Sequence, residues 1–261
     1  MTNPGAVRGA DRANLDIRRA ADRAYTDTGW LHSRHSFSFG DHYDPANTHH
    51  GLLLVNNDDI VKAGSGFDSH PHRDTEIVTW VLDGSLVHQD SNGNAGVIYP
   101  GLAQRMSAGT GIVHSERNDS WTLTGAESHS EPVRFVQMWV LPDESGRPPD
   151  YQQCDVGDQL RPGELVTIAS GMPRHSGATA ISIGNRQAAL HGARLQPGQS
   201  VQLPSAPYLH LFIARGQVAL EQAGPLAEGD TARFTASDGR RITADTAAEI
   251  LVWEMHAGLT G

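Results

Sequence analysis

The sequence contains a single cysteine, Cys154, few aromatic residues and no long hydrophobic run. One cysteine excludes an internal disulfide, which fits a protein of a reducing compartment. The longest apolar stretches are short, such as residues 51–55, whereas a membrane-spanning helix needs roughly 20 apolar residues. The first residues lack the apolar segment of a signal peptide. These absences predict a cytoplasmic protein that does not cross a membrane.

Positive charge is also in the minority. The chain has 20 Lys and Arg residues against 30 Asp and Glu residues, so its formal net charge is −10. An acidic surface repels phosphate backbones, which disfavours direct binding of nucleic acid. Hydrophobic residues make up 38% of the chain, enough for a packed core. Its 261 residues exceed the usual size of one domain, about 100–200 residues, and predict one large domain or two modest ones.

Apolar residues come in short runs that are rich in β-branched side chains and are broken by Gly, Pro, Asn and Asp. Residues 76–82, 134–141 and 209–214 are examples. Runs at intervals of roughly ten residues predict an all-β sandwich or barrel. Helical periodicity is scarce, and residues 15–25 are only a weak helix candidate. Residues 56–59, Asn-Asn-Asp-Asp, have the composition of a polar turn with two solvated carboxylates.

An internal repeat divides the chain. Residues 101–111 align without a gap with residues 229–239, 128 positions later, and a strand that ends in a glycine precedes each segment. A repeat of this period predicts two β domains of similar build. The expected division is a flexible tail over residues 1–14, an N-terminal domain over 15–147 and a C-terminal domain over 148–261.

Histidine occurs 14 times, and several of these residues follow a pattern. His70 and His72 are two residues apart, so on a strand they face the same side, and Glu76 has the same parity. His114 and Glu116 form a second such pair about forty residues later. If both strands meet in one barrel, three imidazoles and a carboxylate converge, which suits a divalent transition metal. Four protein ligands leave open positions on an octahedral metal, which indicates catalysis rather than a closed structural site.

These residues resemble a known family. Two motifs closely resemble those of cupins: His70-x-His72-x-x-x-Glu76 followed by Gly84, and Gly111-x-x-His114-x-x-x-Asn118. Residues 70–84 and 106–116 resemble the pirin family more narrowly, and residues 35–45 resemble the signature of its bacterial branch that includes quercetin 2,3-dioxygenases. The resemblance is strong over residues 29–142 and extends to the second half by architecture. It implies an all-β bicupin, with two jelly-roll β-barrel domains in one chain.

The resemblance also implies a metal centre in the N-terminal domain. Pirins use the two histidines of the first motif with the histidine and glutamate of the second, which here are His70, His72, His114 and Glu116. The implied ion is Fe(II), with Ni, Mn, Co, Cu or Zn as alternatives. Many other cupins use the glutamate that matches Glu76 instead. Here we expect Glu76 to orient a metal-binding histidine through a hydrogen bond.

The C-terminal domain is expected to hold no metal. The repeat places Ile242 and Ala244 at the second pair of ligand positions, and counting back from Gly216 places Gln202 and Pro204 at the first pair. None of these four residues matches a ligand of the N-terminal domain. A role in packing or in partner binding is therefore expected for the C-terminal domain.

The resemblance implies a dioxygenase that cleaves a flavonol such as quercetin with O2, in a monomeric protein. Glu116 would act as general base and remove the proton of the substrate hydroxyl. The alternative is a non-enzymatic, iron-dependent redox sensor that binds and regulates a protein partner, for which the acidic surface suits a basic partner. A zinc-type isomerase or hydrolase is a third possibility, but the chain lacks a basic cluster beside the ligands. Catalytic uptake of O2 would distinguish the dioxygenase from the redox sensor.

Overall fold

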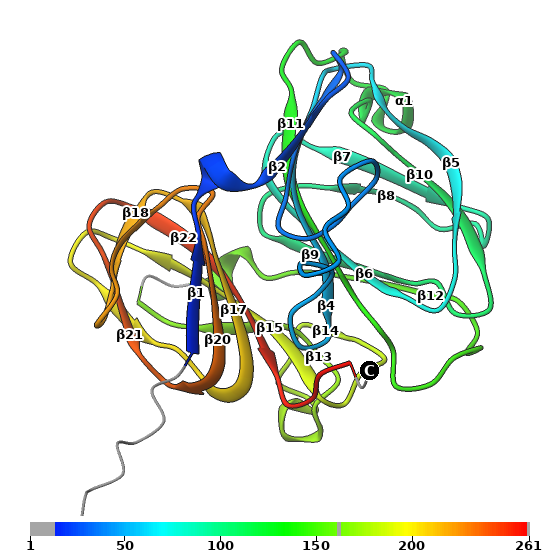
Figure 1. Ribbon diagram of the computed structural model, residues 1–261. Helices are drawn as coiled ribbons and strands as arrows, with labels where there is room; N and C mark the ends of the chain where they lie inside the picture. The colour runs from blue at the N-terminus through cyan, green and yellow to red at the C-terminus, as the bar shows by residue number, and fades with distance from the viewer. Residues whose placement is uncertain (1–13, 161–162, 260–261) are drawn as a thin grey trace, which may run out of the picture.

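The computed structural model describes residues 14–160 and 163–259, and its regular secondary structure is almost entirely β-strand. Two β-barrels lie side by side (Figure 1), so the predicted all-β architecture with two domains in one chain is confirmed. Among the described residues, no helix is long and apolar enough to cross a membrane. Nearly all of the expected flexible tail, residues 1–13, lies outside the described part of the chain.

Each barrel combines a seven-stranded sheet with a four-stranded sheet. In the first barrel the large sheet has the order β12 (Asp150–Asp155), β9 (Leu102–Ser107), β6 (Glu76–Asp83), β11 (Val133–Val140), β4 (Leu53–Val61), β3 (Leu31–His35), β2 (Ala24–Asp27). Its small sheet has the order β5 (Gly66–His72), β10 (Ile112–Arg117), β7 (Leu86–Asp90), β8 (Ala95–Ile98). A short helix, α1 (Trp121–Thr124), follows β10.

The second barrel repeats this plan. Its large sheet has the order β1 (Asn14–Arg18), β20 (Thr231–Asp238), β17 (Ser205–Arg215), β22 (Ala248–Met255), β15 (Ala188–Leu195), β13 (Val166–Ser170), β14 (Ile181–Ser182). Its small sheet has the order β16 (Ser200–Gln202), β21 (Arg241–Ala244), β18 (Gln217–Leu220), β19 (Gly224–Ala227). The repeated sequence segments form β9 and β20, which occupy matching places in the two large sheets.

Two strands cross the domain boundaries that the sequence suggests. Strand β1 precedes the first barrel in the chain but pairs with β20 of the second (Figure 1). Strand β12 follows residue 147 but pairs with β9 of the first barrel. Residues 15–25, the weak helix candidate, form β1, the 3-10 turn η1 (Ala20–Asp22) and the start of β2. Edge strands attach through backbone hydrogen bonds, so the repeat does not reveal them.

Side chains along the central strands point alternately into the barrel interior and toward the contact between the barrels. On β6, Val81 belongs to the core inside the first barrel, whereas Trp80 and Leu82 belong to a different hydrophobic cluster. That cluster also contains Phe212 and Trp253 of the second barrel. The largest hydrophobic core therefore lies between the two large sheets and holds the barrels together.

Residues 56–59 do not form a turn, which corrects the prediction made from composition. They lie in the middle of β4, and all four side chains are buried, with exposures of at most 8%. Asn57 and Asp59 line a cavity of the first barrel, whereas Asp58 points toward the second barrel. Burial of polar side chains in a strand requires partners from distant segments, which composition alone does not show.

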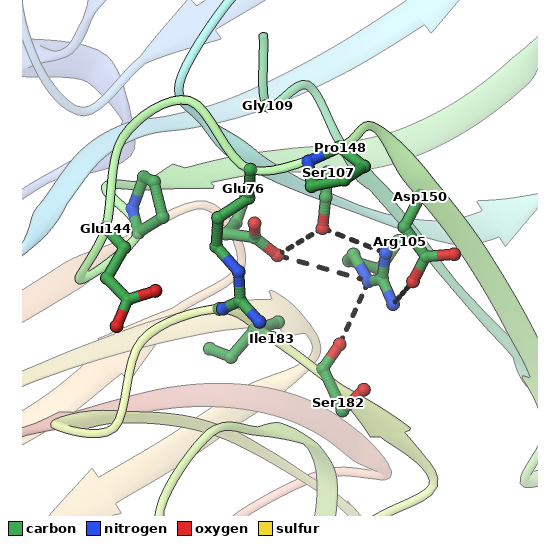
Figure 2. Close-up of a pocket in the computed structure, with 12 residues that line it drawn as sticks. Glu76, Arg105, Ser107, Gly109, Glu144, Pro148, Asp150, Ser182 and Ile183 are labelled. Carbon is green, nitrogen blue, oxygen red and sulfur yellow. Dashed lines mark hydrogen bonds and ion pairs between the residues drawn. The ribbon is translucent and has the colours of Figure 1, made fainter.

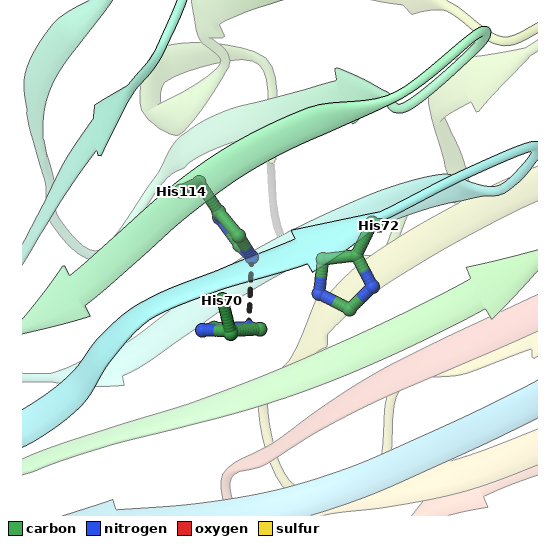
Figure 3. A group of neighbouring side chains, drawn as sticks. All are labelled: His70, His72 and His114. Carbon is green, nitrogen blue, oxygen red and sulfur yellow. Dashed lines mark hydrogen bonds between the residues drawn. The ribbon is translucent and has the colours of Figure 1, made fainter.

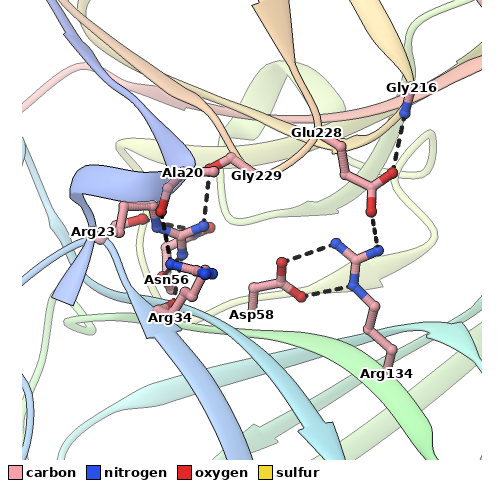
Figure 4. A network of polar contacts seen from close by, with 10 residues as sticks. Ala20, Arg23, Arg34, Asn56, Asp58, Arg134, Gly216, Glu228 and Gly229 are labelled. Carbon is pink, nitrogen blue, oxygen red and sulfur yellow. Dashed lines mark hydrogen bonds and ion pairs between the residues drawn. The ribbon is translucent and has the colours of Figure 1, made fainter. Parts of the chain in front are cut away.

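An ion-pair network joins the barrels at this strand (Figure 4). Arg134 on β11 donates two hydrogen bonds of 2.9 Å to the carboxylate of Asp58 and a third to Glu228 of the second barrel. Nearby, the buried guanidinium of Arg23 donates to the carbonyl of Gly229 at 3.0 Å. The contact between the barrels is therefore both apolar and charged.

Replacement of Arg134 tests how much this network contributes to the free energy of unfolding. Arg134→Met leaves the carboxylate of Asp58 buried without its cation, so we expect the free energy of unfolding to fall by on the order of 3 kcal/mol. Glu228→Gln removes only the half-exposed partner and should cost less than about 1 kcal/mol. Urea denaturation of both variants checks this, and equal losses for the two would contradict the account.

Candidate metal centre

The candidate metal centre is built on the antiparallel pairing of β5 with β10. This register places His70 directly opposite His114 and His72 opposite Ile112. The Nε2 atoms of His70 and His114 are 3.1 Å apart. Figure 3 shows the rings of His70, His72 and His114 close together beside these strands. One nitrogen from each ring lies within 4.8 Å of the others, so the structure brings these three histidines together.

Glu116 lies next to His114, which also belongs to this cluster. Together with His88 and His114 it forms a second group whose candidate ligand atoms lie within 4.8 Å of one another. Gln137 donates a hydrogen bond of 2.6 Å to Oε2 of Glu116, and Thr79 donates one of 3.4 Å to Oε1. These bonds fix the orientation of the carboxylate. The two groups share His114, but Glu116 is grouped with His88 and His114 and not with His70 and His72, so the four expected ligands surround His114 in two groups.

The histidines have the properties that metal binding requires. Burial and neighbouring imidazoles lower the pKa of His72 to about 4 and that of His114 to about 3, so both are neutral at pH 7. The buried Nε2 of His72 has no hydrogen-bond partner among the described residues. Two bonds of about 2.1 Å at a right angle would separate two nitrogens by about 3 Å, close to the spacing of His70 and His114. The residues present therefore fit a divalent metal ion.

His88 is a residue of this cluster for which we predicted no role from sequence. It is fully buried, its Nδ1 lies 3.5 Å from Nδ1 of His114, and its Nε2 lies 3.3 Å from Oδ2 of Asp90. If Asp90 accepts from His88, then His88 can accept from His114, which leaves Nε2 of His114 free to bind a metal. The spacing of His88 and Asp90, again two residues on one strand, is the signal that could have revealed this pair.

Glu76 lies elsewhere, on the face of β6 that points toward the second barrel (Figure 2). Ser107 donates a hydrogen bond of 2.8 Å to its carboxylate, and Arg105 lies 4.0 Å away. It lines a cavity of about 400 Å³ that also includes Ser182 of the second barrel. In the described part of the chain Glu76 makes no hydrogen bond to a histidine, so the structure gives no support to its expected orienting role. Sequence parity fails here because a turn separates β5 from β6.

A second cavity of about 520 Å³ opens onto the histidine cluster. His70, His72 and Glu116 line it together with aromatic side chains, among them Phe39, Phe67 and Trp139. The ring of Trp139 meets that of His72 edge to face, with centroids 4.9 Å apart. Trp139 is thus a wall of the cavity, whereas Trp80 and Trp253 are core residues. An apolar cavity with a few polar groups at one place is typical of a small-molecule site.

The second barrel carries aliphatic residues at the matching positions. Val201 lies opposite Ile242 on β21, as His70 lies opposite His114 on β10. Counted in this register, the first two ligand positions are those of Val201 and Leu203, one residue before the predicted Gln202 and Pro204. The prediction of Ile242 and Ala244 agrees with this register. All four side chains are buried in the core of the second barrel and offer no donor atom. The error of one residue arose because loops of equal length were assumed.

Measurements of metal affinity distinguish a residue that binds the metal from a residue that only positions a metal ligand. His72→Ala should lower the affinity for a divalent metal more than about 100-fold, because it removes a ligand. His88→Gln should lower it by about 10–100-fold, the usual effect of a group behind a ligand. His49→Ala, at an exposed histidine, is the control. Competition with a coloured chelator measures all three, and a loss for His88→Gln as large as that for His72→Ala would contradict this assignment.

Comparisons with known proteins agree with this geometry. A family model described as Pirin matches residues 17–140, and one described as quercetinase C-terminal cupin domain matches residues 167–255. The chain is similar to a crystal structure of a bacterial pirin from Escherichia coli in complex with nickel(II). The two are 30% identical, the TM-score is 0.81, and the match covers 94% of this chain and 100% of that one.

Curated relatives are similar over nearly their whole length. A protein of Mycobacterium tuberculosis, provisionally named quercetin 2,3-dioxygenase, is 63% identical over 95% of this chain and 97% of its own length. Quercetin 2,3-dioxygenase of Escherichia coli is 46% identical over 92% of this chain and 97% of its own. The two barrels, the histidine cluster and these similarities together show that the chain belongs to the pirin family and is a bicupin.

Proposed function

We propose that this protein is a metal-dependent dioxygenase that cleaves a flavonol such as quercetin with O2. The observation that carries the proposal is the cluster of imidazoles beside the carboxylate of Glu116, at an apolar cavity of about 520 Å³ that His70, His72 and Glu116 line. A cavity of this size holds a molecule of roughly three rings. The names of the mycobacterial and Escherichia coli relatives support the same substrate class.

The metal would be held by His70, His72, His114 and Glu116. When bound, a divalent ion such as Fe(II) supplies Lewis acidity toward chelating oxygens and a route for electrons to O2. Nickel(II) is the ion of the similar Escherichia coli pirin, so Ni is an alternative, as are Mn, Co, Cu and Zn. One carboxylate and three imidazoles suit any of these ions.

The residues of the chain prepare the substrate. Glu116, held by Gln137 and Thr79, faces the cavity and can accept the proton of a substrate hydroxyl. Phe39 and Trp139 pack against each other at 5.7 Å and offer flat apolar walls to an aromatic ring. These walls keep water away from the electron-rich anion that deprotonation produces.

Oxygen uptake by anaerobically purified, Fe(II)-loaded protein with quercetin tests the proposal. We expect turnover by the wild type and a loss of about 10²- to 10⁴-fold in kcat for Glu116→Gln with the same metal content, since general bases contribute this much. The control is Glu76→Gln, which alters a buried glutamate on the face of β6 that points toward the second barrel. Its kcat should stay within about twofold of that of the wild type. No uptake by fully loaded wild type would contradict the proposal and favour the regulatory alternative.

A further inference from the structure

Asp59 is a buried carboxylic acid in the proposed substrate cavity to which the reaction above gives no role. Its side chain is only 3% exposed, and its Oδ1 has no hydrogen-bond partner among the described residues. The preceding residue, Asp58, faces the other side of β4 and is fully paired with Arg134 (Figure 4). The chain therefore pairs both oxygens of Asp58 and leaves Oδ1 of Asp59 without a partner among the described residues.

The polar residues around Asp59 satisfy one another. Nδ1 of His35 lies 2.9 Å from Oδ1 of Asn57, and its Nε2 lies 2.8 Å from the hydroxyl of Thr26. These three residues line the same cavity as Asp59, His70 and Glu116. An unpaired buried oxygen is unfavourable unless a ligand or water meets it. In the described part of the chain, Oδ1 of Asp59 thus stays unpaired in a polar wall whose members His35, Asn57 and Thr26 bond to one another.

The surroundings of Asp59 favour its neutral form. Burial raises the pKa of Asp59 to about 7, and the carboxylates of Asp58 and Glu116 act in the same direction. The hydroxyl of Ser33, opposite it on β3, and the guanidinium of Arg23 oppose the shift. The side chains of neighbouring strands on the cavity side, His35 on β3 and Gln137 on β11, carry no fixed charge. A protonated carboxyl group can donate a hydrogen bond, which an ionised one cannot.

We propose that Asp59, in its protonated form, donates a hydrogen bond to an oxygen of an aromatic substrate whose chelating oxygens lie at the histidine cluster. The inference rests on the proposed function, which places those chelating oxygens. It names the substrate class more narrowly, as a polyhydroxylated aromatic chelator with a further oxygen away from the chelating pair. Asp59 then determines specificity, because a chelator without that oxygen leaves the wall unsatisfied.

Binding to Zn(II)-loaded protein without O2 tests this, because zinc does not change oxidation state and no turnover occurs. The probes are quercetin and 3-hydroxyflavone, which keeps the chelating pair but lacks the other hydroxyl groups. We expect Asp59→Leu to weaken quercetin binding about tenfold, the value of one hydrogen bond, and to leave 3-hydroxyflavone within about twofold. Asp59→Asn keeps a donor, and Glu76→Gln, which alters a buried glutamate outside this cavity, is the control; both variants should bind both probes as the wild type does.

The pH dependence gives a readout that a purely structural role would not change. The ratio of wild-type to Asp59→Asn affinity for quercetin should be constant below about pH 6. It should fall above the pKa of Asp59, by up to about tenfold per pH unit, because the wild type loses its donor and the amide does not. The ratio cancels the ionisation of quercetin itself, which both proteins share. A ratio that does not change between pH 5.5 and 8.5 would overturn the inference.

The outcomes also separate this inference from the proposed function. If Asp59→Leu discriminates between the two probes while Fe(II)-loaded wild type takes up no O2, the inference stands and the dioxygenase proposal fails. If O2 is consumed but Asp59→Leu binds quercetin as tightly as the wild type, the dioxygenase proposal stands and the inference about Asp59 fails. Failure of the Zn(II)-loaded wild type to bind quercetin would overturn the assignment of Asp59.

Discussion

The register between β5 and β10 determines where every group of the candidate metal centre lies. With His70 directly opposite His114, two imidazoles meet at 3.1 Å, and the regular alternation along β10 keeps Glu116 on the same face as His114. A slip of one residue would turn the side chains of one strand to the other face. On the other side of β10, strand β7 places His88 opposite Glu116. The geometry of the cluster thus depends on backbone pairing.

The two barrels share one plan but use it differently. The second fills its interior with aliphatic side chains, including Val201 and Ile242 at the matching ligand positions. The first keeps a polar interior, which costs stability, and its outer face packs against the second barrel through a large apolar core. Strand β4 serves both needs at once, because Asp58 joins the barrels and Asp59 faces the cavity. The second barrel therefore covers the outer face of the first barrel's large sheet.

Much of this arrangement follows from sequence, and the failures have physical causes. The spacing of two residues located His70, His72 and His114, because side chains alternate along a strand whatever surrounds it. The same parity misplaced Glu76, since alternation does not carry across a turn. Asn56–Asp59 read as a turn because its partners, Arg134 among them, come from distant strands. The edge strands β1 and β12 pair with β20 and β9 through backbone hydrogen bonds, which leave no mark in the repeat.

Anomalous diffraction from crystals soaked without oxygen in Fe(II) or Ni(II) tests the central claim most directly. The account predicts one strong peak between β5 and β10, within about 2.0–2.2 Å of a ring nitrogen of His70, His72 and His114 and of a carboxylate oxygen of Glu116. A peak held by His88, His114 and Glu116 without His70 and His72, or no peak in the first barrel, would contradict it.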